Sequence, residues 1–149
     1  MMLSQHFALE ELLASDTAVR CGIDNAGDAQ IIRNLTRLAA TLERVRQAVG
    51  GPIHITSGYR SPELNARVGG SKESMHMQGL AADIICPAFG VPLKVCRAIA
   101  AAKIPVDQVI NEYAAWCHVG LSPDGQAPRN QTLTIAAPHL GYELGLRSI

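Results

Sequence analysis

The chain lacks an excess of charge of either sign, because 13 lysines and arginines balance 13 aspartates and glutamates in 149 residues. Without a strong positive field, it has no broad attraction for nucleic acid or for anionic membrane surfaces. The N-terminal residues carry neither a basic start nor a long apolar segment, so we expect no signal peptide. No window reaches the roughly 18 consecutive apolar residues of a membrane span. These absences predict a protein made in the cytoplasm, with no nucleic-acid partner and no membrane insertion.

Cysteine spacings typical of metal or redox sites are also missing. The four cysteines (Cys21, Cys86, Cys96 and Cys117) form no C-x-x-C pair. We expect buried, reduced thiols, as is usual in cytoplasmic proteins. If Cys117 lies on a strand, its side chain points away from the face that carries Trp116 and His118.

The composition is that of an ordinary globular protein, with 48% hydrophobic and 17% charged residues. The length suits one domain spanning residues 1–149. The sequence contains no internal repeat, linker or low-complexity tract. We expect a single domain and, in solution, a monomer.

Hydrophobic periodicity predicts an α+β fold, with helices packed on a small, mostly antiparallel sheet. The clearest element is a helix over residues 29–49, with Asp28 as its N-cap and Gly50 at its end. Its apolar residues recur at spacings of four and three and form one stripe. Further helices are expected at 7–15, 62–68 and 92–102, and strands at 53–56, 80–85, 106–110, 116–121 and 132–136.

The residues that packing explains least lie between Ile53 and Ile85, and shortly after them in NEYAAWCHVGL. Asp83 stands in the apolar run GLAADII, where a buried carboxylate is costly unless a cation or metal compensates it. His76 precedes that strand and His118 belongs to another, so the three can converge at one rim of the sheet. Two histidines, a carboxylate and an open fourth position are a common ligand set of zinc hydrolases.

A zinc hydrolase also needs a carboxylate that takes a proton from water and returns it to the leaving amine. Glu112, near His118 in sequence, is the candidate. Each of these residues has a simpler alternative. His76 can be an ordinary surface or core histidine, Glu112 a loop carboxylate and Trp116 a core residue, while Arg60 can brace a turn and Ser74 can cap a loop.

The run SGYRSPELNARVGGSKESMHMQGLAADI, followed by EYAAWCHV, resembles the zinc D-Ala-D-Ala carboxypeptidases, which are related to lysostaphin-type peptidases and to the hedgehog signalling domain. The family pattern is S-G-[YF]-R-S, then S-x-H-x-x-G-x-A-x-D, then a late W-x-H preceded by a glutamate. The resemblance extends from HFALEELLASDTA to about Leu121. It looks closest to compact members encoded by bacteriophages and prophages, whereas residues 122–149 match no motif.

The resemblance implies a fold of the hedgehog and D-Ala-D-Ala-peptidase type and a Zn²⁺ ion bound by His76, Asp83 and His118. It implies that Arg60 holds the substrate and stabilises the oxyanion, and that Ser74 and Trp116 contact the substrate. Glu112 is the implied base, although in other branches the base lies only two or three residues before the last histidine.

The sequence therefore predicts a zinc peptidase that cuts an amide bond in the stem peptide of peptidoglycan, either as a D-Ala-D-Ala carboxypeptidase or as an L-Ala-D-Glu endopeptidase. Such an enzyme acts on the cell wall, and delivery by a phage or prophage suits a chain without a signal peptide. The first alternative is a non-catalytic, zinc-containing module that binds the wall or forms part of a phage. The second is a metal-free globular domain.

Overall fold

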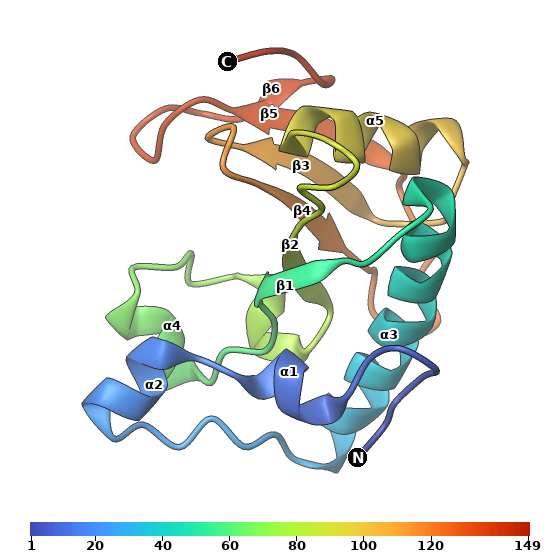
Figure 1. Cartoon of the computed structure of the whole chain (residues 1–149). Coiled ribbons are helices and arrows are strands. Elements are labelled where there is room, and N and C mark those ends of the chain that lie inside the picture. The colour runs from blue at the N-terminus through green and yellow to red at the C-terminus, as the bar shows by residue number, and fades with distance from the viewer.

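The computed structural model describes residues 1–149, and Figure 1 shows its elements. The helices are α1 (Leu9–Leu13), α2 (Asp16–Cys21), α3 (Ala29–Val49), α4 (Pro62–Arg67), the 3₁₀ helix η1 (Met75–Gln78) and α5 (Pro92–Ala101). The strands are β1 (His54–Ser57), β2 (Ala81–Ile85), β3 (Gln108–Glu112), β4 (Trp116–Gly120), β5 (Gln131–Ile135) and β6 (Glu143–Leu144). The expected α+β class is confirmed.

All strands join one sheet in the order β1-β2-β4-β3-β5-β6. The sheet is mixed but mostly antiparallel, as expected, because only β3 and β5 run parallel. The end of β4 explains this pairing, since Gly120 lies opposite Gln108 at the start of β3. The chain re-enters the sheet at the same end, with Gln131 against Gln108, so β5 runs in the direction of β3.

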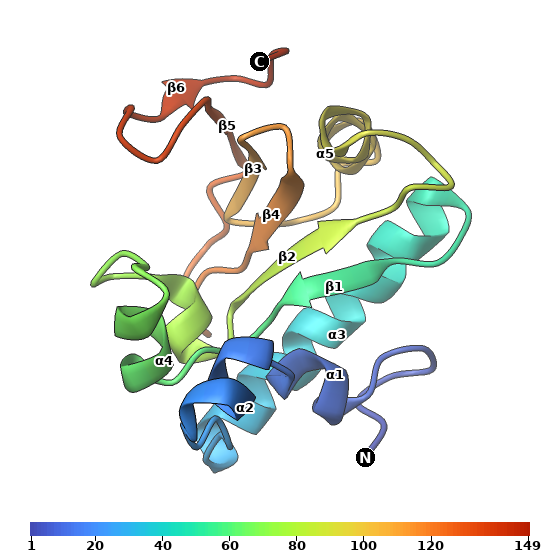
Figure 2. The same ribbon diagram turned by 60° about the vertical axis from the view of Figure 1, so that its left-hand side comes forward.

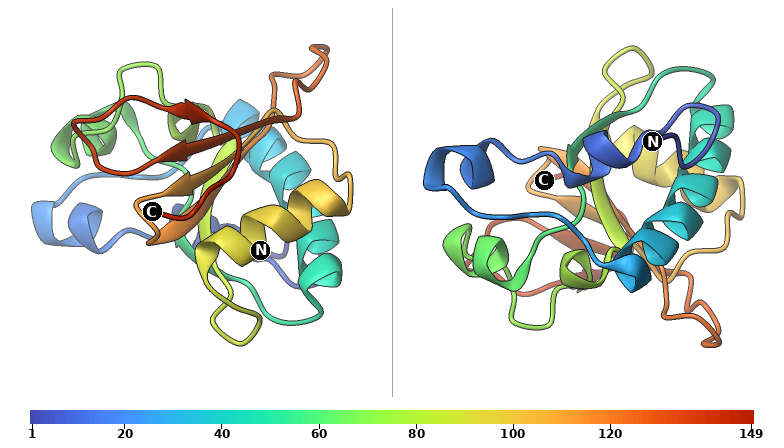
Figure 3. Two further views of the ribbon diagram at one scale, coloured as in Figure 1. Left: turned by 90° about the horizontal axis from the view of Figure 1, so that it is seen from above. Right: turned by 90° about the horizontal axis from the view of Figure 1, so that it is seen from below.

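The sheet lies between two groups of helices (Figure 3). Helices α3 and α5 lie on one side, where α5 packs on β2, β3 and β4 and also contacts α3. Helices α2 and α4 lie toward the other side. Figure 2 shows the paired strands β1 and β2 running alongside α3. None of the helices combines the length and the apolar character needed to cross a membrane.

Helix α3 buries the apolar stripe that its sequence predicts. Leu38 and Leu42, for example, are fully buried in the main core. The carboxylate of Asp28 accepts a hydrogen bond from the backbone N–H of Ile31 at 2.9 Å and caps the helix. Gly50 ends it with a left-handed φ of 72°, a conformation that glycine adopts without strain.

Side chains along β2 and β4 point alternately into the core and to the opposite face of the sheet. Ile84 of β2 and Cys117 of β4 belong to the main apolar core. Their neighbours Asp83 and His118 point to the other face, because successive side chains of a strand alternate. Cys117 therefore points away from Trp116 and His118, as predicted.

The expected helix over residues 7–15 is wrong in detail, because the chain forms two short helices there. Ala14 has an extended backbone, with φ −63° and ψ 135°. The hydroxyl of Ser15 then accepts a hydrogen bond from the N–H of Ala18 at 3.1 Å. This N-cap starts α2, a second helix that was not predicted.

Three smaller corrections concern a turn, a strand and a thiol. Residues 75–78 form the short helix η1, which was not predicted, and the Ser74 hydroxyl caps it by accepting from the N–H of His76 at 3.2 Å. Strand β6 was not predicted, because a strand of two residues is too short to show an alternation of apolar and polar residues. Cys21 is exposed, whereas the other three cysteines are buried as expected.

Candidate active site

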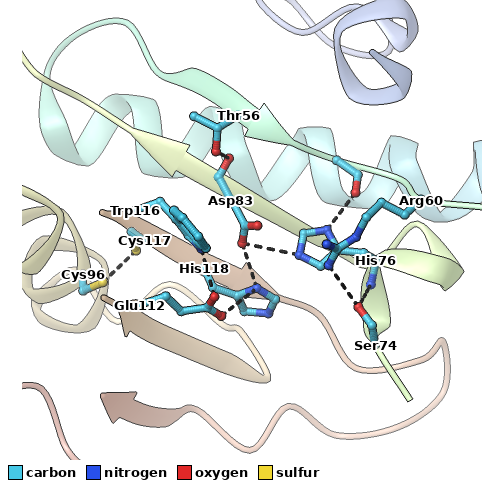
Figure 4. A network of polar contacts seen from close by, with 11 residues as sticks. Thr56, Arg60, Ser74, His76, Asp83, Cys96, Glu112, Trp116, Cys117 and His118 are labelled. Atoms are coloured by element: carbon cyan, nitrogen blue, oxygen red, sulfur yellow. Dashed lines mark hydrogen bonds and ion pairs between the residues drawn. The ribbon is translucent and has the colours of Figure 1, made fainter. Parts of the chain in front are cut away.

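Three side chains singled out in the sequence converge on one point at the sheet (Figure 4). Asp83 in β2 is paired with His118 in β4, and His76 reaches them from η1. His76 Nε2 lies 3.4 Å from Asp83 Oδ1, and His118 Nδ1 lies 3.0 Å from the same oxygen. All three residues are buried, and one ligand atom from each lies within 4.8 Å of the others. This cluster can hold a metal ion.

A backbone carbonyl fixes the ring of His76. Its Nδ1 lies 2.7 Å from the carbonyl oxygen of Gly58, so this nitrogen carries the proton and donates it. The Nε2 atom that faces Asp83 then has a free lone pair, as a metal-binding histidine requires. Gly58 itself is needed for packing, because a Cβ there would lie 2.3 Å from the carbonyl oxygen of Leu12. A larger residue would push α1 away from the turn that orients His76.

Burial and mutual contact shift the pKa of each group in the cluster. Burial lowers the pKa of His76 and so favours the neutral imidazole, the form that binds metals. Burial alone raises the pKa of Asp83, but the two neighbouring imidazoles outweigh it and hold that pKa well below its usual range. Burial also lowers the pKa of His118, and its contact with the Asp83 carboxylate raises it overall. The cluster thus places a buried negative charge between two nitrogen donors.

Glu112 ends β3 beside this cluster. Its Oε1 lies 3.5 Å from His118 Nδ1, while its Oε2 accepts a hydrogen bond from the indole Nε1 of Trp116 at 2.9 Å. Glu112 and Trp116 face each other across the β3–β4 pair. Burial raises the pKa of Glu112, although His118 opposes the shift. A partly buried carboxylate next to a metal cluster is suited to accept a proton and return it.

Arg60 and Ser74 lie beside His76 (Figure 4). The Nη2 of Arg60 lies 3.4 Å from the Ser74 hydroxyl, and its buried Nε has no hydrogen-bond partner. Desolvation lowers the pKa of Arg60, and the carboxylates of Asp83 and Glu112 oppose that shift. The guanidinium therefore faces the same site as these two carboxylates.

The cluster opens into a cleft with a volume of about 1,020 Å³. Every residue predicted for the site lines this cleft: Arg60, Ser74, His76, Asp83, Glu112, Trp116 and His118. All three tyrosines of the chain line it as well. Part of the wall comes from the C-terminal segment, which contributes Arg129, Leu133 and Tyr142. The cleft thus brings together residues from nearly the whole length of the chain.

Sequence reasoning missed several contributors to this site. Gly58 acts through its backbone carbonyl, and the glycine of the SGYR motif was its only signal. Tyr113 stands next to the predicted base, but nothing in its spacing marked it. Tyr142 belongs to a segment without a recognisable motif, so only the fold reveals that it reaches the cleft.

Comparison with known proteins agrees with this geometry. The family model described as Peptidase M15 matches residues 5–120, well over half of the chain, and the match contains the whole metal cluster, Arg60 and Glu112. A comparison with curated protein sequences gave no match. Residues 121–149, with β5 and β6, lie outside the family match. The chain therefore belongs to the peptidase M15 family, the family of the zinc D-Ala-D-Ala carboxypeptidases that its motifs resemble, and is a metallopeptidase.

Proposed function

We propose that the protein is a zinc-dependent peptidoglycan peptidase that hydrolyses an amide bond in the stem peptide. One observation carries the proposal: the buried cluster of His76, Asp83 and His118 stands in an open cleft, with the Glu112 carboxylate 3.5 Å from one of its nitrogen donors. A structural metal site is normally closed by a fourth protein ligand, whereas a catalytic site keeps one position open.

The donor atoms fit zinc. Bonds of about 2.0–2.2 Å around a tetrahedral ion place neighbouring donors roughly 3.3–3.5 Å apart. The Asp83 oxygen lies 3.4 Å from the His76 nitrogen and 3.0 Å from the His118 nitrogen, close to that spacing. All three donors lie within 4.8 Å of one another, so small side-chain movements bring them around one ion. When bound, zinc supplies a Lewis acid and lowers the pKa of a coordinated water to about 7.

The protein's own groups have separate tasks in this proposal. Glu112 takes a proton from the attacking water and later gives it to the leaving amine. The Trp116 indole occupies Oε2, so Oε1, which faces the cluster, is the oxygen that carries the proton. Arg60 donates to the carbonyl oxygen as negative charge develops on it. Ser74 hydrogen-bonds the substrate backbone, and Trp116 forms part of the wall against which the substrate lies.

The shape of the cleft supports a peptide substrate. Gln108 and Glu112, at opposite ends of β3, both line it. Four residues of strand span roughly 13 Å, which gives room for several residues of a peptide on this floor. Stem peptides contain D-residues, so ordinary proteins should be poor substrates. The resemblance to compact phage and prophage members supports a wall-degrading enzyme of the phage type.

The test is mass spectrometry of purified peptidoglycan after incubation with the protein, with and without a chelator. Chelator-sensitive loss of one alanine identifies a carboxypeptidase, and release of a longer fragment identifies an endopeptidase. Walls of several stem-peptide chemistries should be compared, because the bond that is cut depends on them. If the protein holds its metal but cleaves none of these walls, the proposal is wrong and a non-catalytic wall-binding module takes its place.

A further inference from the structure

The turn that joins β3 to β4 has an unfavourable backbone for its sequence. Tyr113 and Ala114 both adopt left-handed conformations, with φ of 59° and 55°. Turns of this kind usually carry Asn and Gly, because a Cβ is disfavoured at left-handed φ. The turn nevertheless lies between Glu112 and Trp116, the two residues joined by the indole hydrogen bond. A strained turn persists only where its surroundings hold it in place.

Tyr113 is held by the C-terminal segment. Its backbone N–H donates to the carbonyl oxygen of Ile135 in β5 at 2.9 Å. Its side chain packs against a small apolar cluster made by Ile110, Leu133 and Ile135. Two of these three residues belong to β5, which lies outside the part of the chain that matches the family. The segment without a motif thus fixes a residue next to the site.

The ring of Tyr113 in turn contacts Trp116. The two rings meet edge to face, with centroids 5.3 Å apart and planes at 85°, a favoured geometry for aromatic pairs. Trp116 then donates its indole N–H to Glu112, as Figure 4 shows. The contacts form a continuous series from β5 through Tyr113 and Trp116 to the carboxylate.

We propose that Tyr113 is a positioning residue, backed by β5, that holds Trp116 at the angle at which its indole orients the Glu112 carboxylate. The proposal rests on the proposed proton-transfer role of Glu112. It also gives residues 131–135 a part in the reaction, although they carry no motif of their own. The rigid aromatic ring is the feature of Tyr113 that matters, and the phenol hydroxyl is dispensable.

The chain contains a single tryptophan, so its fluorescence reports Trp116 alone. Tyr113→Asn removes the ring but suits the left-handed backbone, so the turn should survive. We expect a red-shifted emission and a kcat lowered by roughly 10- to 100-fold, with little change in KM, because a misplaced catalytic group mainly affects the transition state. Tyr113→Phe keeps the ring and should retain the wild-type emission and most of the wild-type kcat.

Ala114→Gly is the matched control. It relieves the same turn without touching the ring, so it should leave both emission and kcat unchanged. Wild-type emission and kcat in Tyr113→Asn would overturn the inference, and so would an equal loss in Ala114→Gly, which would assign the effect to the turn alone. If the wild type cleaves no wall substrate, the proposed function fails, while the emission of the same variants still decides whether Tyr113 holds Trp116.

Discussion

Two neighbouring residues of β4 serve different purposes on the two faces of the sheet. Cys117 is fully buried in the core, where its Sγ lies 2.8 Å from that of Cys96. His118, one position later, belongs to the candidate metal-binding cluster on the opposite face. Strand β2 repeats the division, since Ile84 belongs to the core and Asp83 to the cluster.

This difference explains how the side chains of the cluster are held in place. The apolar face fixes the strands against α3 and α5, so the side chains on the other face have little freedom. Buried polar groups are costly when unpaired, but each of the three cluster side chains has a partner. His76 contacts the Gly58 carbonyl, and Asp83 lies between the two imidazoles. One face therefore supplies stability, and the other supplies chemistry.

Replacing a residue of the cluster should have the largest effect on activity. In His118→Ala we expect substoichiometric metal and a loss of activity greater than the roughly 10- to 100-fold seen when a group that only supports a ligand is removed. Metal analysis of the purified protein, together with a peptidoglycan cleavage assay, measures both. A variant that binds one equivalent of metal as tightly as the wild type would remove His118 from the ligand set.

Cys117→Ala is the control for that variant on the same strand. The side chain lies in the core, so the change should lower the free energy of unfolding by about 1 kcal/mol and leave metal content intact. Denaturant unfolding and metal analysis of both variants give the comparison. Loss of metal in Cys117→Ala would show that the two faces are not separable in this way.

A large-to-small substitution in the core should lower the stability of the protein and leave the activity of folded molecules unchanged. Leu42 is fully buried on α3, so Leu42→Ala should cost roughly 2–5 kcal/mol of unfolding free energy. Turnover per folded molecule, corrected by the folded fraction from circular dichroism, should match that of the wild type. A disproportionate fall in turnover would mean that α3 packing also adjusts the cleft.

The smallest effect concerns a polar pair at the start of β3. Arg129 donates to both carboxylate oxygens of Asp107, at 2.9 and 2.8 Å, and this contact lowers the pKa of Asp107. A depressed carboxyl pKa adds stability above the unfolded value of about 4, and that stability is lost as pH falls further. Arg129→Ala should therefore unfold slightly more easily than the wild type at pH 7, with the difference shrinking progressively as pH falls below about 4. Thermal unfolding across this range would show it, and a difference that grows in acid would contradict it.

The sequence predicted the fold best where the determinants are local. The helix expected at 29–49 is α3 residue for residue, because its stripe and its capping residues lie within or next to it. The break at Ala14 was missed, although Ser15 marks it, because the apolar pattern continues across it. The order of the strands and the parallel β3–β5 pair depend on contacts between distant segments, which no local pattern encodes.

The candidate site likewise has features that local sequence predicts and features that depend on contacts between distant segments. The three candidate ligands could be named, because an aspartate in an apolar run needs a cation or a metal to compensate its charge, and two histidines were at hand to complete a ligand set. The roles of Arg60 and Ser74 came from the family resemblance. What Trp116 does to Glu112 could not be predicted, because it depends on the register of β3 against β4. The contact of Tyr113 with β5 was equally hidden, since it joins residues more than 20 positions apart through a backbone carbonyl.

The most direct test of the account is to measure metal content and turnover in one preparation of Glu112→Gln. The amide keeps the shape of the side chain and an oxygen for the Trp116 indole, but it cannot take the proton. We expect metal content equal to that of the wild type and peptidoglycan turnover lower by about 10²- to 10⁴-fold. Wild-type turnover in this variant would contradict the assignment of Glu112 as the proton-transfer group.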